Sequence, residues 1–149
     1  MDVEVVSSEM VVPTIPIGAP HPPSLWTSNL DLVILNAYIK TVYFFEKPPV
    51  PASDHHREIS RLKQALGTAL SHFWPMAGRL SHDHSGRLQI DCNDAGILFV
   101  EARCAREMNS LPGGFTPNPN LLDLVPTLDS TADLAAQPLV VIQVCTQLY

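Results

Sequence analysis

The sequence predicts a mixed α/β domain in which one long amphipathic helix packs against a mixed sheet. Three observations lead to this fold class. Apolar residues recur with a helical period over residues 54–73, and valine-rich or apolar runs typical of strands lie on both sides of that segment. The chain has 149 residues, of which 46% are hydrophobic, so it can form one packed domain.

The residues before the helix predict a strand, a loop, a helical turn and a second strand. Residues 3–12 are rich in valine and form the first predicted strand. Residues 13–26 are predicted as a loop, because they hold five prolines and a glycine. Residues 28–34 (SNLDLVI) are short and apolar, which is typical of one helical turn. Residues 41–46 (TVYFFE) are β-branched and aromatic, which favours a strand.

The long helix is predicted over residues 54–73. Ser53 or Asp54 suits the N-cap position, because a short side-chain oxygen accepts a hydrogen bond from a free first-turn N–H. Pro75 lacks a backbone N–H and is expected to end the helix. The apolar face consists of residues at steps of three and four: Ile59, Leu62, Leu66, Leu70 and Phe73.

His55 and His56 follow an aspartate, which raises the question of an active site. In the first turn of a helix, adjacent side chains point about 100° apart, so the two rings cannot hold one metal ion together. The N-terminal end of a helix also disfavours a positively charged imidazolium. The pair is therefore interpreted as an exposed helix start.

Beyond the helix, three short segments predict strands that pair in an antiparallel meander. They cover residues 76–83, 86–92 and 96–104, and the Gly, Asn and Asp residues between them are typical of turns. Residues 105–137 predict a loop region. Residues 139–149 form a continuous apolar run, typical of a central strand buried on both faces. Either an earlier strand pairs with it, or the chain lacks its continuation.

Composition and charge argue against several classes of protein. The net charge is −6 and only 16% of residues are charged, which disfavours nucleic-acid binding, because that function needs a basic face. The N-terminal segment has no basic region, and no apolar run approaches the ~18 residues of a membrane span. We therefore expect a soluble, cytoplasmic protein.

No metal site or nucleophile motif is recognisable from the residues alone. His82 and His84 flank Asp83, but no third ligand stands at a metal-binding spacing, so a solvated turn is expected. The GxSxG, P-loop and GxGxxG motifs are absent. Three cysteines have no CxxC spacing and are expected to pack as small apolar side chains: Cys92, Cys104 and Cys145.

Three longer motifs stand in order along the chain: LWTSNLDL at residues 25–32, FWPMAGRL at 73–80 and IDCNDAGILFVEA at 90–102. Together they resemble the N-terminal part of plant BAHD acyltransferases, most of all the hydroxycinnamoyl-CoA transferases that act on shikimate-like or amine acceptors. The resemblance runs from about Val3 to the last residue. We interpret the motifs as markers of the fold, with Arg79 solvating the edge of a strand.

The resemblance implies a chloramphenicol-acetyltransferase-like fold of two similar domains, of which residues 1–149 are an incomplete N-terminal one. It implies acyl transfer from a coenzyme A thioester to an alcohol or amine, with the histidine of an HxxxDG motif as general base. None of the six histidines here has an aspartate four residues later. The catalytic histidine is therefore expected beyond Tyr149, and the chain alone is expected to be catalytically incomplete.

The resemblance also implies substrates and substrate-binding residues. Acyl-CoA is the expected co-substrate, with no bound cofactor or metal and a monomeric full-length enzyme. Tyr38, Thr41 and Tyr43 align with the acceptor-lining segment of shikimate-type members, which usually carry histidine where Tyr38 stands, so shikimate is disfavoured as the acceptor. Two alternatives remain open: a non-catalytic binding protein made from half of the fold, and a complete small enzyme with an unrecognised site.

Overall fold

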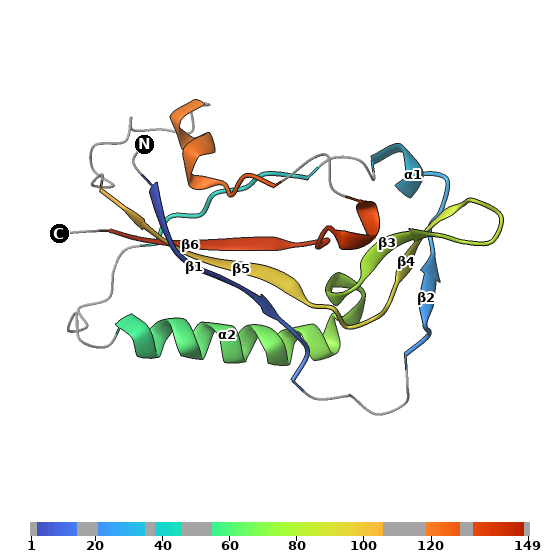
Figure 1. Cartoon of the computed structure of the whole chain (residues 1–149), viewed down its shortest axis with the longest axis horizontal. Helices are drawn as coiled ribbons and strands as arrows, with labels where there is room; N and C mark the ends of the chain where they lie inside the picture. The colour runs from blue at the N-terminus through green and yellow to red at the C-terminus, as the bar shows by residue number, and fades with distance from the viewer. Residues whose placement is uncertain are drawn as a thin grey trace.

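The structure is a computed structural model that places one long helix against one of two small sheets (Figure 1). The first sheet has the strand order β1-β5-β6, and the second has the order β2-β4-β3. The mixed α/β class is confirmed. The structure describes six ranges of the chain: 3–14, 21–34, 38–45, 55–105, 119–128 and 133–147.

The first sheet carries the hydrophobic core. Strand β1 (Val3–Val11) pairs antiparallel with the central strand β5 (Ile97–Cys104), and β5 pairs in parallel with β6 (Val141–Gln147). Ile97 and Phe99 on β5 are the largest fully buried side chains among the described residues. They belong to the same buried cluster as two helix residues, so the helix and the central strand share one core.

Helix α2 (His55–His72) packs closely on the chain that follows β1. The N–H of Thr14 donates to the carbonyl of Gly67 at 3.2 Å. A Cβ atom on Gly67 would lie 2.7 Å from Cγ2 of Thr14 and 3.0 Å from the carbonyl oxygen of Val12, so this close approach favours glycine. A 3₁₀ turn, η2 (Trp74–Ala77), follows the helix and has proline in its first positions, which confirms that the helix ends before Pro75.

The second sheet is a small antiparallel sheet at the far end of the molecule from both termini (Figure 1). Its central strand β4 (Leu88–Asp91) pairs with β2 (Ser24–Trp26) on one side and with β3 (Arg79–His82) on the other. The β3–β4 turn is closed by Asp83, whose Oδ1 accepts the N–H groups of Ser85 and Arg87, each at 2.8 Å. The Ser85 hydroxyl also donates to this oxygen at 2.7 Å, and this bond, followed by the backbone bonds, lowers the pKa of the Asp83 carboxyl.

The local patterns predicted several elements well. The N-terminal strand and the long helix are confirmed with bounds that differ by one or two residues, and the helical turn is confirmed as α1 (Asp31–Ile34). The solvated turn at His82 and His84 is also confirmed, since both side chains are exposed. The N-cap candidates Ser53 and Asp54 lie outside the described residues.

The predicted three-stranded meander is wrong in its last strand. Strands β3 and β4 form a hairpin, but β5 leaves that sheet and pairs with β1 and β6. The chain changes direction at Asp94 and Gly96, which have φ angles of 54° and 85°. The N–H of Gly96 then donates to the carbonyl of Ala77 at 2.8 Å, which holds the chain in its new direction at the start of β5.

Four further predictions need correction. Strand β2 lies inside the region predicted as a loop. Residues 41–45 belong to no strand, and Glu46 lies outside the described residues. Among the described strands, β6 is an edge strand with partly buried side chains, not a central one; it does pair with an earlier strand, β5. Two 3₁₀ turns break the predicted 105–137 loop: η4 (Pro119–Leu124) and η5 (Leu134–Ala136).

Candidate functional site

The three sequence motifs meet in the second sheet, which we call the motif sheet (β2, β3 and β4). Ile90 on β4 lies between Leu25 on one side and Leu80 on the other. Each of these residues comes from a different motif, so segments far apart in the sequence form one unit. This arrangement supports the interpretation of the motifs as markers of the fold.

Arg79 is buried, with only 7% of its surface exposed, and is held by backbone carbonyls. One guanidinium nitrogen donates to the carbonyls of Gly78 and Gly96, each at 2.7 Å, and the other donates to that of Ala95 at 3.3 Å. Burial lowers the pKa of Arg79, while Tyr38 raises it. The prediction that Arg79 solvates a strand edge is therefore wrong. Its guanidinium group is buried and instead holds the turn that leads into β5.

The TSNLD part of the first motif caps α1. The N–H of Ser28 donates to Oδ2 of Asp31 at 2.8 Å, and the N–H of Asp31 donates back to Oγ of Ser28 at 3.3 Å. The hydrogen bonds to Ser28 lower the pKa of Asp31. Both side chains satisfy backbone groups at the start of a helix, which is a structural task.

The same segment is bonded to the β3–β4 hairpin. The hydroxyl of Thr27 donates to the carbonyl of Leu88. The guanidinium of Arg87 donates to the carbonyl of Thr27 at 2.8 Å and to Oδ1 of Asn29 at 2.7 Å, and it lies 4.5 Å from the ring centre of Trp26. The polar groups of the motif are thus used to hold the sheet together.

His21 lies between Trp74 and Asp94 at the side of the motif sheet. Its ring is stacked on the Trp74 ring with centroids 4.7 Å apart, and Nε2 is 3.2 Å from Oδ2 of Asp94. Nδ1 is 3.2 Å from the carbonyl oxygen of Pro22. Because both partners only accept hydrogen bonds, this geometry favours the doubly protonated ring. The carbonyl of Pro22, and then Asp94, raise the pKa of His21.

His55 and His56 differ in their surroundings. His56 is exposed, as predicted, whereas His55 is half-buried and its Nε2 lies 3.4 Å from Oε1 of Glu101 on β5. Oε2 of the same carboxylate accepts a hydrogen bond from the Ser7 hydroxyl at 3.3 Å. The acid therefore lies between the serine and the histidine. A nucleophilic relay needs the histidine between the other two, so this group is not a catalytic triad.

The three predicted acceptor-binding residues lie in one extended segment. The hydroxyl of Tyr38 donates to the carbonyl of Pro138 at 2.6 Å, which ties this segment to the chain just before β6. Burial raises the pKa of Tyr38. Thr41 is exposed and Tyr43 is 76% exposed, so these two side chains are not enclosed by the described part of the chain.

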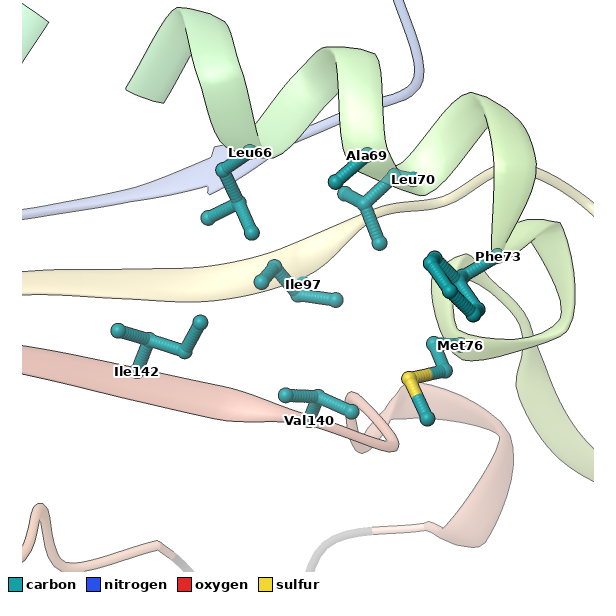
Figure 2. A pocket seen from close by; sticks show the side chains of 8 residues that line it. All are labelled: Leu66, Ala69, Leu70, Phe73, Met76, Ile97, Val140 and Ile142. Atoms are coloured by element: carbon teal, nitrogen blue, oxygen red, sulfur yellow. The ribbon is translucent and has the colours of Figure 1, made fainter. Parts of the chain in front are cut away.

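An apolar hollow of about 130 Å³ opens between the side of α2 and the start of β6, and we call it the α2–β6 groove (Figure 2). Figure 2 shows helix side chains on one side of the hollow, Val140 and Ile142 on the other, and Ile97 between them. Among the residues that the structure describes, no polar side chain lines it. The groove is lined by eight residues: Leu66, Ala69, Leu70, Phe73, Met76, Ile97, Val140 and Ile142.

The described residues offer few other sites. Within the described ranges, no group of three or more His, Cys, Asp or Glu side chains is placed to hold a metal ion. The three cysteines are free thiols that pack in or near the core, as predicted. In the same part of the chain, no helix combines the length and the apolar character needed to cross a membrane.

Comparison with known proteins identifies the class of protein that this fold and these motifs define. The profile of the Transferase family matches residues 1–148. The chain therefore belongs to this family, the BAHD acyltransferases. Its predicted membership is confirmed, and so is the chloramphenicol-acetyltransferase-like fold.

Individual relatives are plant hydroxycinnamoyltransferases. The chain is 40% identical over 145 residues to a hydroxycinnamoyl-CoA:5-hydroxyanthranilate N-hydroxycinnamoyltransferase of Avena sativa, covering 97% of this chain and 32% of the relative. It is 39% identical over 145 residues to the shikimate O-hydroxycinnamoyltransferase of Nicotiana tabacum, with the same coverage. The crystal structure of vinorine synthase matches 98% of this chain and 35% of that protein, with a TM-score of 0.73 and 25% identity. The chain thus spans about a third of the length of these proteins.

Proposed function

We propose that this polypeptide is part of an enzyme that transfers an acyl group, most directly a hydroxycinnamoyl group, from acyl-CoA to a hydroxyl or amine acceptor. The observation that carries this proposal is an identity of about 40% with two hydroxycinnamoyltransferases over 97% of the chain. One of these relatives is named for an amine acceptor and the other for the hydroxyl acceptor shikimate. The proposal therefore includes both acceptor classes.

The described histidines give little support for a general base within this chain. A base must have a free ring nitrogen near the acceptor proton. Both ring nitrogens of His21 face hydrogen-bond acceptors, so neither is free. The other five histidines, of which His55 faces the carboxylate of Glu101 through Nε2, have no aspartate at the spacing of the family motif. No HxxxD sequence occurs in the 149 residues. We therefore propose that the base is the histidine of an HxxxDG motif outside these residues and that this chain alone is catalytically incomplete.

Tyr38, Thr41 and Tyr43 are proposed to line the acceptor side of the complete site. The Tyr38 hydroxyl uses its proton on the carbonyl of Pro138 but retains lone pairs that accept a hydrogen bond. Thr41 and Tyr43 are exposed and can be covered by substrate or by other parts of a longer protein. We propose that the complete enzyme is a cytoplasmic monomer that uses acyl-CoA as co-substrate and no bound metal or cofactor.

The test is a single-chain chimera in which these 149 residues replace the matching part of the tobacco relative. The chimera is expected to transfer the acyl group of p-coumaroyl-CoA to an amine or hydroxyl acceptor, whereas the 149-residue chain alone is not. A folded chimera that binds acyl-CoA or acceptor but transfers nothing would favour a non-catalytic binding protein instead. Turnover by the 149 residues alone would show a complete small enzyme.

The acceptor-lining residues are tested in the same chimera. Thr41→Val and Tyr43→Phe are expected to raise the KM for the acceptor about tenfold, since each removes one hydrogen bond worth about 1.4 kcal/mol. The KM for p-coumaroyl-CoA should stay unchanged. Phe45→Leu is the matched control, because Phe45 is an exposed residue of the same segment without a hydroxyl. Equal effects of all three variants on both KM values would contradict the assignment.

A further inference from the structure

The extended segment of residues 38–45, which we call the acceptor segment, has two different sides (Figure 1). Successive side chains of an extended chain point to opposite sides. Tyr43 and Phe45 are 76% and 83% exposed, whereas Tyr38 is only 41% exposed. By the same alternation Thr41 lies on the side of Tyr43, and it is exposed as well. Tyr38 therefore points toward the described body of the protein, away from the two hydroxyl-bearing residues that face outward.

The Tyr38 hydroxyl binds a part of the chain that both sheets hold in place. It donates to the carbonyl of Pro138 at 2.6 Å and lies 3.5 Å from Oε1 of Gln137. Pro138 lies opposite Arg79 of β3 in an isolated antiparallel bridge, which joins it to the motif sheet. Two residues farther on, the carbonyl of Val140 accepts a backbone hydrogen bond from β5, which joins the same stretch to the first sheet. The carbonyl that Tyr38 binds is therefore a fixed point.

The phenol of Tyr38 also lies within electrostatic reach of the Arg79 guanidinium. Burial raises the pKa of Tyr38, and the charge of Arg79 lowers it. Burial likewise lowers the pKa of Arg79, and Tyr38 raises it. The same guanidinium holds the three carbonyls of the turn before β5. The motif that contains Arg79 therefore reaches the acceptor segment at Tyr38, both through space and through Pro138.

We propose that Tyr38 is a positioning residue, which orients Thr41 and Tyr43 toward the acceptor by tying their segment to the motif sheet through the carbonyl of Pro138. This proposal rests on the proposed function, and it adds to any contact that Tyr38 itself makes with the acceptor. The tie lies three residues before Thr41 and five before Tyr43, so the direction of both side chains depends on it. Hydrogen bonds behind a binding site commonly hold the groups that contact the ligand in this way.

A double-mutant cycle in the chimera described above tests whether Tyr38 acts through Thr41. Thr41→Val alone is expected to raise the KM for the acceptor about tenfold, and Tyr38→Phe alone about fivefold. If the segment is no longer held, the Thr41 hydroxyl contributes little, so the double variant should show about tenfold and not the product of about fiftyfold. The kcat should stay within about twofold of the parent, and the KM for p-coumaroyl-CoA should stay unchanged.

Thr27 offers a matched control, because its hydroxyl also donates to a backbone carbonyl, that of Leu88 in the motif sheet. Like Tyr38→Phe, Thr27→Val removes one such bond and keeps the shape of the side chain. It should lower the melting temperature as well. Because Thr27 does not contact the acceptor segment through this bond, Thr27→Val should leave the KM for the acceptor unchanged, both alone and together with Thr41→Val.

A second measurement tests the tie without any acyl transfer. Lys40 is exposed and lies two residues after Tyr38, so trypsin can cleave after it once the acceptor segment loosens from the protein. In the chimera, Tyr38→Phe is expected to raise the rate of cleavage after Lys40 about threefold or more, as followed by mass spectrometry. Thr27→Val should leave this rate unchanged.

Three outcomes would overturn the proposal. One is an unchanged rate of cleavage after Lys40 in Tyr38→Phe. Another is a double variant whose KM for the acceptor equals the product of the two single effects, since Tyr38 would then act independently of Thr41. The third is an equal rise of this KM in Thr27→Val. Faster cleavage in Tyr38→Phe of a chimera that transfers no acyl group would contradict the proposed function and support the tie between Tyr38 and Pro138.

Discussion

The motif sheet and the α2–β6 groove differ in what their side chains contact. In the motif sheet, polar groups are paired within the chain: Arg79 holds three carbonyls, and Arg87 holds a carbonyl and the side-chain amide oxygen of Asn29. In the groove, apolar side chains face an open hollow. The motifs that reveal the family therefore stabilise this part of the fold, and three of their residues also line the groove: Phe73, Met76 and Ile97.

The largest expected effect is at Arg79. Arg79→Met leaves three buried or half-buried carbonyls without their donor, so the free energy of unfolding should fall by about 3 kcal/mol or more. Arg79→Lys keeps the charge but not the planar fork, and should recover only part of this loss. Urea unfolding measures both. If Arg79→Met unfolds at the same urea concentration as the parent, the motif sheet is not held by this residue.

The next effect compares two glycines with similar backbone conformations. A Cβ at Gly96 would lie 2.4 Å from the carbonyl oxygen of Val11, whereas a Cβ at Gly86 would have open space around it. Both have positive φ, so each alanine costs about 1–2 kcal/mol in backbone strain. Gly96→Ala should cost clearly more, because it also separates β5 from β1. Equal melting temperatures for the two variants would show that the crowding at Gly96 is relieved by small shifts.

A smaller effect is expected where the exposed segment joins the chain before β6. Tyr38→Phe removes the hydrogen bond to the carbonyl of Pro138 and should lower the free energy of unfolding by about 1 kcal/mol. Tyr43→Phe should leave it unchanged, because Tyr43 is largely exposed. Thermal unfolding of the two variants separates these results. A larger loss for Tyr43→Phe would mean that the exposed segment packs differently.

The sequence predicted elements that depend on neighbouring residues and missed contacts between distant ones. The period of the apolar residues predicted α2 within two residues at each end. The carbonyls that hold Arg79 lie up to 17 residues along the chain, and the carboxylate that holds His21 lies 73 residues away. The chain passes from the motif sheet to the first sheet just before β5, and this step depends on the φ angles of Asp94 and Gly96. The spacing of apolar residues does not predict these angles. The acceptor-binding residues came from the family resemblance, and they remain a proposal.

The smallest expected effect is the pH dependence of the contact between His21 and Asp94. The folded protein raises the pKa of His21 above its ordinary value of 6.5. The stabilisation is therefore fully present below pH 6.5 and is lost as the pH rises through the higher folded pKa. Asp94→Asn should lower that pKa and weaken the pH dependence of the melting temperature near neutrality. An NMR titration of His21 measures this shift, and an unchanged pKa in Asp94→Asn would contradict the contact.

The central claim is that the motif sheet supports the fold and that the catalytic base lies outside these 149 residues. His21 tests it most directly, since it has a carboxylate partner and lies beside two of the motifs. In the chimera with the tobacco-derived part, kcat is measured for p-coumaroyl transfer by the parent and by His21→Gln. The expected kcat of His21→Gln lies within about threefold of the parent, because only the loss of a general base would cost about 10²–10⁴-fold. A fall of a hundredfold or more, with the melting temperature unchanged, would contradict it and identify His21, beside the motif sheet, as the base.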